Sequence, residues 1–303
     1  MNPMDFSLWP AAARSWQSVL DGAEYAERTG WHGVWIADHF MQNGDDLSVP
    51  VNECLALIAG IAARTERVRV GSMVLGNTYR HPAVVANAAA TIDQLAGGRF
   101  VLGIGAGWQV NEHEVYGIEL PAVGPRLKRF EEACQVITGL LTQERTTFDG
   151  KYYQLKDAPC EPKPARLPIL IGASGEKVAL GIVAKYADEW NHWGRPDLAA
   201  QKGEVFAERC ERIGRDPGEV RRSAQTFLEV VVPGDSEAGE RKARLESRGA
   251  HVVMGSAQEV LDVVAQYPAA GIDELLVPDA FLGEGNRRFE ALERLREEVL
   301  LKL

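Results

Sequence analysis

Cysteine is scarce in this sequence, and its four copies lie too far apart to form a recognisable disulfide or metal-binding motif. Cys54, Cys134, Cys160 and Cys210 include no C-x-x-C pair, so neither a zinc knuckle nor a disulfide framework is indicated. The acids and the imidazole of residues 111–114 also form no H-x-x-x-H or E-x-x-H pair that would put two ligands on one helical face. We therefore expect buried or incidental thiols and no bound metal ion.

Long apolar runs and an excess of positive charge are missing as well. No stretch approaches the roughly 20 apolar residues that a membrane helix needs, and Met1 to Trp9 has no cationic start followed by an apolar run. The formal net charge is −10, and lysines and arginines are scattered or paired with acids, which argues against binding to a phosphate backbone. These absences predict a cytoplasmic protein with neither a nucleic-acid nor a membrane partner.

The residues that are present form an ordinary globular composition. Apolar residues make up 46% and charged residues 25% of the 303 residues, and the two classes are interleaved along the whole length. This length suffices for one large α/β barrel and is close to the upper limit for a single hydrophobic core. We therefore expect residues 1–303 to form one domain.

Short β-branched runs alternate with longer helical stretches, which is typical of parallel β/α units. Eight strand candidates, each followed by a helix, favour a closed (β/α)8 TIM barrel over an open doubly wound sheet. Residues 146–168 are expected to form a hairpin and an extended insertion. The expected strands are 6–9, 33–37, 68–75, 100–104, 169–171, 189–193, 224–232 and 274–277; the main expected helices are 15–28, 52–64, 82–95, 126–141, 198–213 and 287–301, with one more ending near Tyr186 and two between 232 and 274.

Active sites of such barrels lie at the C-terminal ends of the strands, so polar residues there are the first candidates. Asp38 and His39 follow the second expected strand. A histidine there is suited to act as a general base near neutral pH, with the carboxylate of Asp38 close enough to orient it. The alternative is a histidine that only bonds a loop carbonyl.

Two glycine-rich segments follow other strands. Gly103-x-Gly105-x-Gly107 lacks the spacing and the downstream acid of a dinucleotide fingerprint, so its glycines serve either approach to a flat ring or close packing of neighbouring chain. The segment from Gly172 to Gly175 lies between a strand and a helix, where free N–H groups and the helix dipole favour a phosphate. A helix cap by Ser174 is the alternative for that segment.

Other polar clusters give weaker signals. Residues 111–114 place acids and an imidazole side by side without the spacing of a metal site. Ser174 is outside a G-x-S-x-G elbow, which removes the usual esterase interpretation. Trp190 to Trp193 could line an aromatic pocket, and rim packing explains them equally well.

Taken in order, these strand ends resemble the bacterial-luciferase-like flavin and deazaflavin oxidoreductases, especially their coenzyme F420-dependent branch. The resemblance spans the chain, and the ordered series of motifs is far more specific than any one of them. The matching segments are Val34 to Phe40, Arg67 to Leu75, Tyr79 to Ala83, Gly98 to Trp108, Asn111-Glu112, Gly124 to Arg126, Pro168 to Asn191 and Gly271 to Leu275.

The resemblance implies roles for particular residues. Asp38 and His39 would lie at the reactive edge of the ring, with His39 as the proton-transfer residue, and Asn111 would bond a polar group of the cofactor. The cofactor-binding residues implied are Ser72, Met73 and Val74 at a backbone bulge behind the ring, Asn111, and Gly172, Ala173, Ser174, Gly175 and Glu176 around the phosphate. Relatives of this barrel carry a non-prolyl cis peptide at the bulge, so we expect the Met73–Val74 bond to be cis.

The activity implied is hydride transfer between C5 of coenzyme F420 and a small organic substrate, with His39 moving the proton. An FMN-dependent monooxygenase is the alternative, because FMN-using relatives share the barrel and the phosphate site. A non-catalytic barrel that binds flavin is a third hypothesis. Sugar-phosphate dehydrogenases of the family bind the substrate phosphate with lysines and an arginine; no such basic trio is evident here, so a sugar phosphate is not favoured. The resemblance also implies a homodimer.

Overall fold

Eight parallel strands close into a barrel in the computed structural model, which describes residues 4–44, 46–247 and 249–303. β1 pairs with both β2 and β13, and β3 pairs with β5, so the circle has no free edge. This confirms the predicted TIM barrel. The barrel strands are β1 (Asp5–Trp9), β2 (Gly33–Ile36), β3 (Arg69–Ser72), β5 (Phe100–Gly105), β8 (Ile169–Gly172), β9 (Glu189–Trp193), β10 (Arg221–Gln225) and β13 (Glu274–Pro278).

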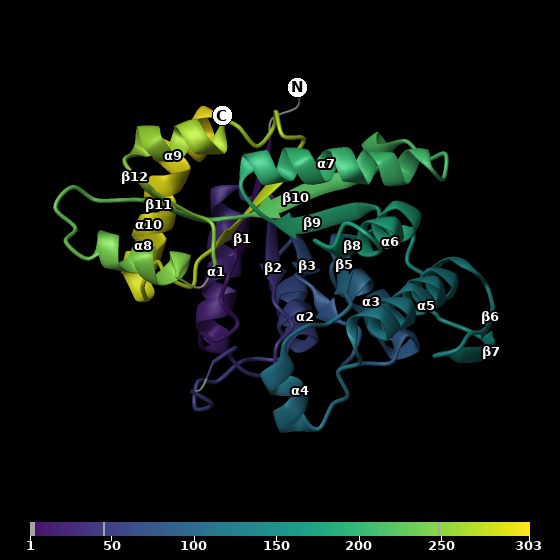
Figure 1. The fold of residues 1–303 in the computed structure, drawn as a ribbon. Coiled ribbons are helices and arrows are strands. Elements are labelled where there is room, and N and C mark those ends of the chain that lie inside the picture. Colours follow the sequence, from purple (N-terminus) through teal and green to yellow (C-terminus); the bar gives the residue numbers. More distant parts are fainter. Residues whose placement is uncertain (1–3, 45, 248) are drawn as a thin grey trace.

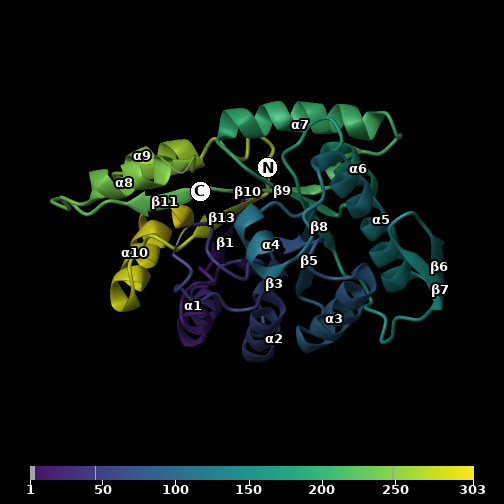
Figure 2. The same ribbon diagram turned by 60° about the horizontal axis from the view of Figure 1, so that its bottom comes forward.

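Helices surround the strands, as Figures 1 and 2 show. In the described part of the chain, none of them is both long and apolar enough to cross a membrane. The helices are α1 (Trp16–Thr29), α2 (Cys54–Arg64), α3 (Pro82–Leu95), α4 (Val110–Tyr116), α5 (Val123–Thr142), α6 (Ala179–Tyr186), α7 (Pro196–Glu211), α8 (Ala238–Glu246), α9 (Ala257–Val264) and α10 (Gly285–Glu298), with short 3-10 helices at Pro217–Glu219 and Leu300–Lys302.

The hairpin predicted within residues 146–168 is present. β6 (Thr146–Asp149) and β7 (Gln154–Ala158) pair antiparallel outside the barrel. All four cysteines are free and buried, as expected.

The strand predicted at residues 224–232 is wrong in its extent. β10 ends at Gln225, and β11 (Phe227–Val230) leaves the barrel to pair with β12 (Val252–Gly255), a strand that the sequence did not predict. The N–H of Thr226 donates to Leu276 O, whereas the N–H of Phe227 donates to His251 O. One continuous apolar run therefore serves two sheets, because its hydrogen-bond partner changes between consecutive residues.

The barrel interior is filled from its N-terminal end. Arg69 bonds both Glu189 and Glu274 there, and the indole of Trp35 donates to Glu274 at 2.9 Å. Burial alone would raise the pKa of Glu274, but Arg69, His32 and Arg221 outweigh it and hold the pKa below its usual value. An apolar layer lies between these ion pairs and the C-terminal end of the barrel. The interior is therefore filled with side chains, and a ligand-binding site is expected at the C-terminal mouth. That layer consists of Trp35, Met73, Val101, Leu170 and Leu276.

The peptide bond between Met73 and Val74 is cis, as predicted. It separates β3 from β4 (Leu75–Gly76), which pairs with the C-terminal end of β5. The third barrel strand is therefore interrupted at its mouth.

Candidate active site

His39 lies at the rim of the C-terminal mouth, directly after β2. Its Nδ1 is 2.9 Å from Oε1 of Glu112, and its ring stands edge-on to the exposed Trp108 at a centroid distance of 5.7 Å. Among the described residues, Nε2 has no hydrogen-bond partner. The imidazole is therefore anchored on one nitrogen and leaves the other for a ligand, which is the arrangement that a proton-transfer group requires.

Glu112, on α4, is the carboxylate that holds this imidazole. It is fully buried, and it also accepts hydrogen bonds from the Tyr79 hydroxyl and the N–H of Phe40. Burial alone would raise the pKa of Glu112, but the hydrogen bonds from His39, Tyr79 and Phe40 outweigh it and hold the pKa below its usual value. The pairing of Glu112 with His39 was not predicted from the sequence, although the Asn111-Glu112 motif pointed to this segment.

The carboxylate of Asp38 does not orient His39, contrary to the interpretation from sequence neighbourhood. It is turned to Arg80, which donates to its two oxygens at 2.7 and 2.9 Å, and it accepts the N–H of Gly76 at 2.9 Å. The side chain is buried, so this bidentate pair fastens the end of β2 to the segment after β4. Asp38 is thus the sequence neighbour of the candidate base, but its carboxylate is bound to Arg80.

The glycines at the ends of β5 and β8 give room to the interrupted third strand. A Cβ at Gly105 or Gly172 would lie 2.8 or 2.9 Å from the side chain of Val74, and one at Gly103 would clash with Ser72 O. Ser72 Oγ donates to Gly103 O at 2.8 Å and is buried, while Met73 belongs to the inner apolar layer. Close packing therefore explains these glycines. The Val74 side chain fills the space that they leave, and Val74, Gly105 and Gly172 are together called the shelf below.

The loop from Gly172 to Glu176 keeps its predicted place between β8 and α6. Residues 174–176 are exposed, and α6 begins only at Ala179, whose N-cap Val178 supplies no side-chain hydrogen bond. Ser174 therefore does not cap the helix. Lys202 donates to Ser174 O at 2.8 Å, which brings a cation beside the loop. An uncapped helix start with a neighbouring cation fits a phosphate, although the N–H of Ala173 is already bonded to Asn191 O.

Asn111 is directed to the loop after β2. Its Nδ2 donates to Gln42 O at 2.9 Å, and its Oδ1 accepts the N–H of Glu112. The structure thus places Asn111 as a link between α4 and that loop, one residue before the partner of His39.

The residues of β9 divide between the two sides of the barrel wall. Trp190 packs against Phe206 of α7 at a centroid distance of 4.9 Å, while Trp193 packs against Trp9 at the mouth at 5.6 Å. His192 lies with Trp190 on the outer side, and burial lowers its pKa to about 4. Side chains of β9 therefore alternate between packing against α7 and facing the mouth.

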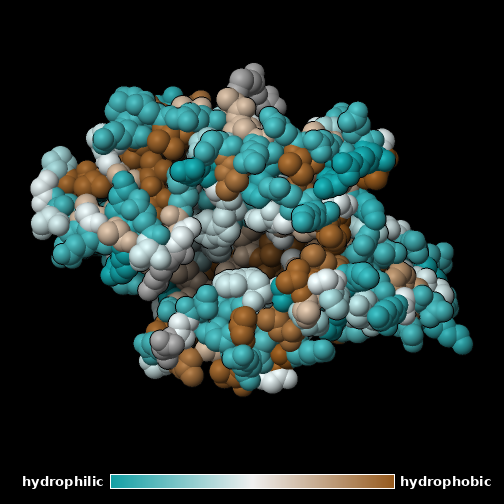
Figure 3. Space-filling model, in the orientation of Figure 1, coloured by the Kyte–Doolittle hydropathy of each residue, from teal (hydrophilic) through white to brown (hydrophobic). Residues whose placement is uncertain are grey.

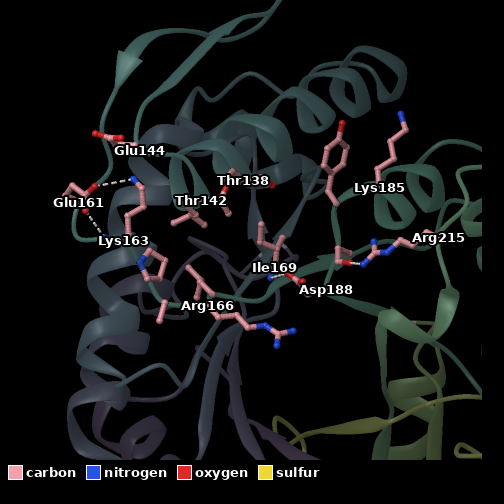
Figure 4. A pocket seen from close by; sticks show the side chains of 16 residues that line it. Thr138, Thr142, Glu144, Glu161, Lys163, Arg166, Ile169, Lys185, Asp188 and Arg215 are labelled. Carbon is pink, nitrogen blue, oxygen red and sulfur yellow. Dashed lines mark hydrogen bonds and ion pairs between the residues drawn. The ribbon is translucent and has the colours of Figure 1, made fainter.

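The surface is hollowed where these strand ends meet. Figure 3 shows the hollow between α7 and α4, with pale and brown atoms on its floor. A separate cavity of about 750 Å³ is lined by Thr138, Arg166, Ile169 and Asp188, among others (Figure 4). Ile169 begins β8 and Asp188 precedes β9, so this cavity lies at the N-terminal end of the barrel, away from His39.

Replacing Glu112 with glutamine tests the anchoring of His39. We expect kcat to fall about tenfold or more with little change in KM, because the neutral amide holds the imidazole less firmly in one tautomer. Steady-state kinetics measures the rate, and 15N NMR of the histidine ring reports the tautomer. An unchanged ring spectrum together with unchanged kcat would contradict the assignment.

The same substitution has a pH-dependent effect on stability. Since the folded state lowers the pKa of Glu112, its charge contributes stability that is present above the unfolded pKa and is lost as the pH falls through the folded pKa. Urea unfolding should therefore give a lower free energy of unfolding for the Glu112→Gln protein than for the original protein at pH 7. This difference should become smaller as the pH is lowered. A difference that grows on acidification would have the wrong sign.

The described residues contain no group of three or more His, Cys, Asp or Glu arranged to hold a metal ion.

Residues 2–294 match the family described as luciferase-like monooxygenase. The F420-dependent glucose-6-phosphate dehydrogenase of Amycolatopsis mediterranei (strain U-32) is 37% identical over 174 residues, 56% of this chain and 50% of that protein. Its namesake from Microbacterium testaceum (strain StLB037) is 40% identical over 220 residues, 71% of this chain and 63% of that protein. The chain thus spans about half to three-fifths of the length of these relatives.

Solved structures share the fold at lower identity. An F420-dependent secondary alcohol dehydrogenase in complex with an F420-acetone adduct superposes with a TM-score of 0.85 and 21% identity, covering 98% of this chain and 99% of that one. A long-chain alkane monooxygenase superposes with a TM-score of 0.82 and 15% identity, covering 100% of this chain and 92% of that one. At these identities the likeness establishes the fold.

Proposed function

Since this chain belongs to the luciferase-like monooxygenase family, we propose that it is an oxidoreductase that binds coenzyme F420 and passes a hydride between it and a small organic substrate. The single observation that carries the proposal is His39, anchored through Nδ1 on Glu112 at the mouth beside a backbone shelf. The names of the curated relatives favour F420 over FMN.

The residues present fit a flat ring with a phosphate-bearing tail. In the shelf only the short aliphatic side chain of Val74 lies over the two glycines, which suits contact with a planar group. The N–H groups after Ala173, together with Lys202, suit the phosphate. Glu176 lies in the same loop, and its carboxylate is 3.4 Å from Lys202 Nζ. This carboxylate therefore partly neutralises the charge of Lys202.

The bound deazaflavin would supply hydride chemistry at its C5, and the protein would supply binding, orientation and proton movement. His39 would exchange the substrate proton at Nε2 while Glu112 fixes the ring. Trp108, exposed and edge-on to His39, would cover one side of the imidazole. Asp38 would act through Arg80 by fixing the strand end that carries His39.

A fluorescence titration tests the proposal. Purified protein is mixed with F420 and, separately, with FMN, and quenching is followed to saturation. We expect micromolar or tighter binding of F420 and much weaker binding of FMN. Micromolar FMN binding without F420 binding would favour an FMN-dependent monooxygenase, and binding of neither would remove the flavin-type cofactor altogether.

Replacing Gly175 with proline tests the phosphate loop. We expect cofactor affinity to fall by about tenfold with a smaller effect on the melting temperature, because proline removes an N–H in an exposed loop. Gly175→Ala is the matched control: it keeps the N–H, and its Cβ would meet only Ala179 Cβ at an ordinary 3.6 Å. A lower melting temperature with unchanged affinity for the proline variant would show that the segment is structural.

A further inference from the structure

A chain of aromatic rings lines one side of the mouth. Trp9 lies 5.6 Å from Trp193 between ring centroids, Trp193 stacks on Phe227 at 5.7 Å, and Phe227 meets Phe281 edge-on at 5.3 Å. These four residues, called the aromatic wall below, come from β1, β9, β11 and the segment after β13. Trp193 remains 40% exposed, so the wall presents ring surface to the mouth.

The strand order places the wall next to the shelf. β1, β13, β10 and β9 are consecutive neighbours in the barrel, and they or their continuations carry the wall. The shelf lies at the ends of β5 and β8 and between β3 and β4, and β8 is the neighbour of β9. His39 follows β2, the strand between β1 and β3, so the candidate base lies where wall and shelf adjoin.

The cations nearest to the two tryptophans along the chain are already paired. Arg14 bonds the buried carboxylate of Asp279 at 3.3 Å and Glu284 at 2.5 Å. Arg195 bonds Asp197 at 3.1 Å, and both side chains are largely exposed. A phosphate in this part of the mouth would meet aromatic rings and would compete with these carboxylates for the two arginines, so the contacts favour an uncharged ligand over a dianion.

We propose that the substrate is an uncharged alcohol or carbonyl compound with an aromatic or bulky apolar group, which packs on the aromatic wall through Trp193 and Phe227. This inference rests on the proposed function, and it separates the chain from the sugar-phosphate specificity named for its curated relatives. Oxidation of such an alcohol transfers a hydride from the carbinol carbon to the deazaflavin and the hydroxyl proton to His39, leaving a carbonyl. The reverse reaction consumes the same hydride and proton.

Calorimetric binding to the F420-loaded protein tests this substrate class. Acetophenone is the neutral aromatic probe and 6-phosphogluconate the phosphorylated one. Acetophenone is already a ketone, and C1 of 6-phosphogluconate is already a carboxylate, so neither carbon can give a hydride to oxidised F420. We expect acetophenone to bind measurably and 6-phosphogluconate to bind at least about tenfold more weakly. Tighter binding of 6-phosphogluconate would overturn the inference.

Variants of the wall locate the binding site. Trp193→Ala should weaken acetophenone binding about tenfold, whereas Trp193→Phe should stay within about threefold because a ring is retained. Tyr186→Ala, at the N-terminal cavity, is the matched control and should not alter binding. Equal affinity for Trp193→Ala and the original protein would overturn the inference, with Phe227→Leu as the second test if circular dichroism shows that Trp193→Ala is misfolded.

F420 affinity is measured for every protein by fluorescence, separately from the calorimetry. If the original protein does not bind F420, the proposed function itself is wrong. Titration of acetophenone into the cofactor-free protein, followed by tryptophan fluorescence, would still test binding to the aromatic wall. Normal F420 binding with a preference for the phosphorylated probe would defeat only the substrate class.

Discussion

Replacing His39 with alanine is expected to lower turnover by about two to four orders of magnitude, the usual effect of losing a positioned acid–base group. Cofactor affinity and folding should change little, because the side chain lies at the rim and its one hydrogen-bond partner keeps two other donors. Single-turnover absorbance of F420 measures the rate, and fluorescence titration measures the affinity.

His81→Asn is the matched control for that experiment. His81 is exposed and caps α3 by accepting the N–H of Ala83, and asparagine keeps a cap. Turnover of this control should stay within about twofold of the original. Full activity of His39→Ala would remove His39 from the mechanism and favour a barrel that binds flavin without this proton-transfer step.

Replacing Arg80 with alanine is expected to cost about 3 to 5 kcal/mol of unfolding free energy, because it leaves a buried carboxylate without its counter-ion. The side chain of Asp38 is 1% exposed and receives two hydrogen bonds from Arg80. The loosened strand end should also misplace His39 and lower turnover. Urea unfolding at pH 7 measures the free energy.

The double variant Asp38→Asn with Arg80→Ala separates the lost pair from a general loss of packing. Removing the charge as well should restore part of the stability, since the remaining amide no longer carries an unpaired charge. A loss below about 1 kcal/mol for Arg80→Ala would place the pair among weak surface ion pairs and contradict its role as a fastener.

The barrel could be predicted from the sequence because its strands are short apolar runs between amphipathic helices, a pattern that is local. β11 and β12 could not be separated from the barrel in the same way. The run from Ala224 to Val232 is continuous in sequence, and the change of partner at Thr226 depends on Leu276 and His251. The choice of hydrogen-bond partner is non-local, so periodicity does not report it.

The site shows the same division. His39 was identified because it follows a strand, but its anchor Glu112 lies 73 residues away, and sequence neighbourhood suggested Asp38 instead. Gly105 was expected either to let the backbone approach a flat ring or to allow close packing. The contact with the Val74 side chain, which the sequence does not reveal, favours close packing. The cis bond at Met73 was predicted through family resemblance, since no local propensity favours a non-prolyl cis peptide.

A crystal structure of the protein with bound F420 would show directly where the cofactor lies relative to His39. We expect the ring to lie against Val74 at the C-terminal mouth, close to His39, with the phosphate at the N–H groups of residues 174–176. A cofactor bound in the cavity beside Ile169 and Asp188, or a ring remote from His39, would contradict it.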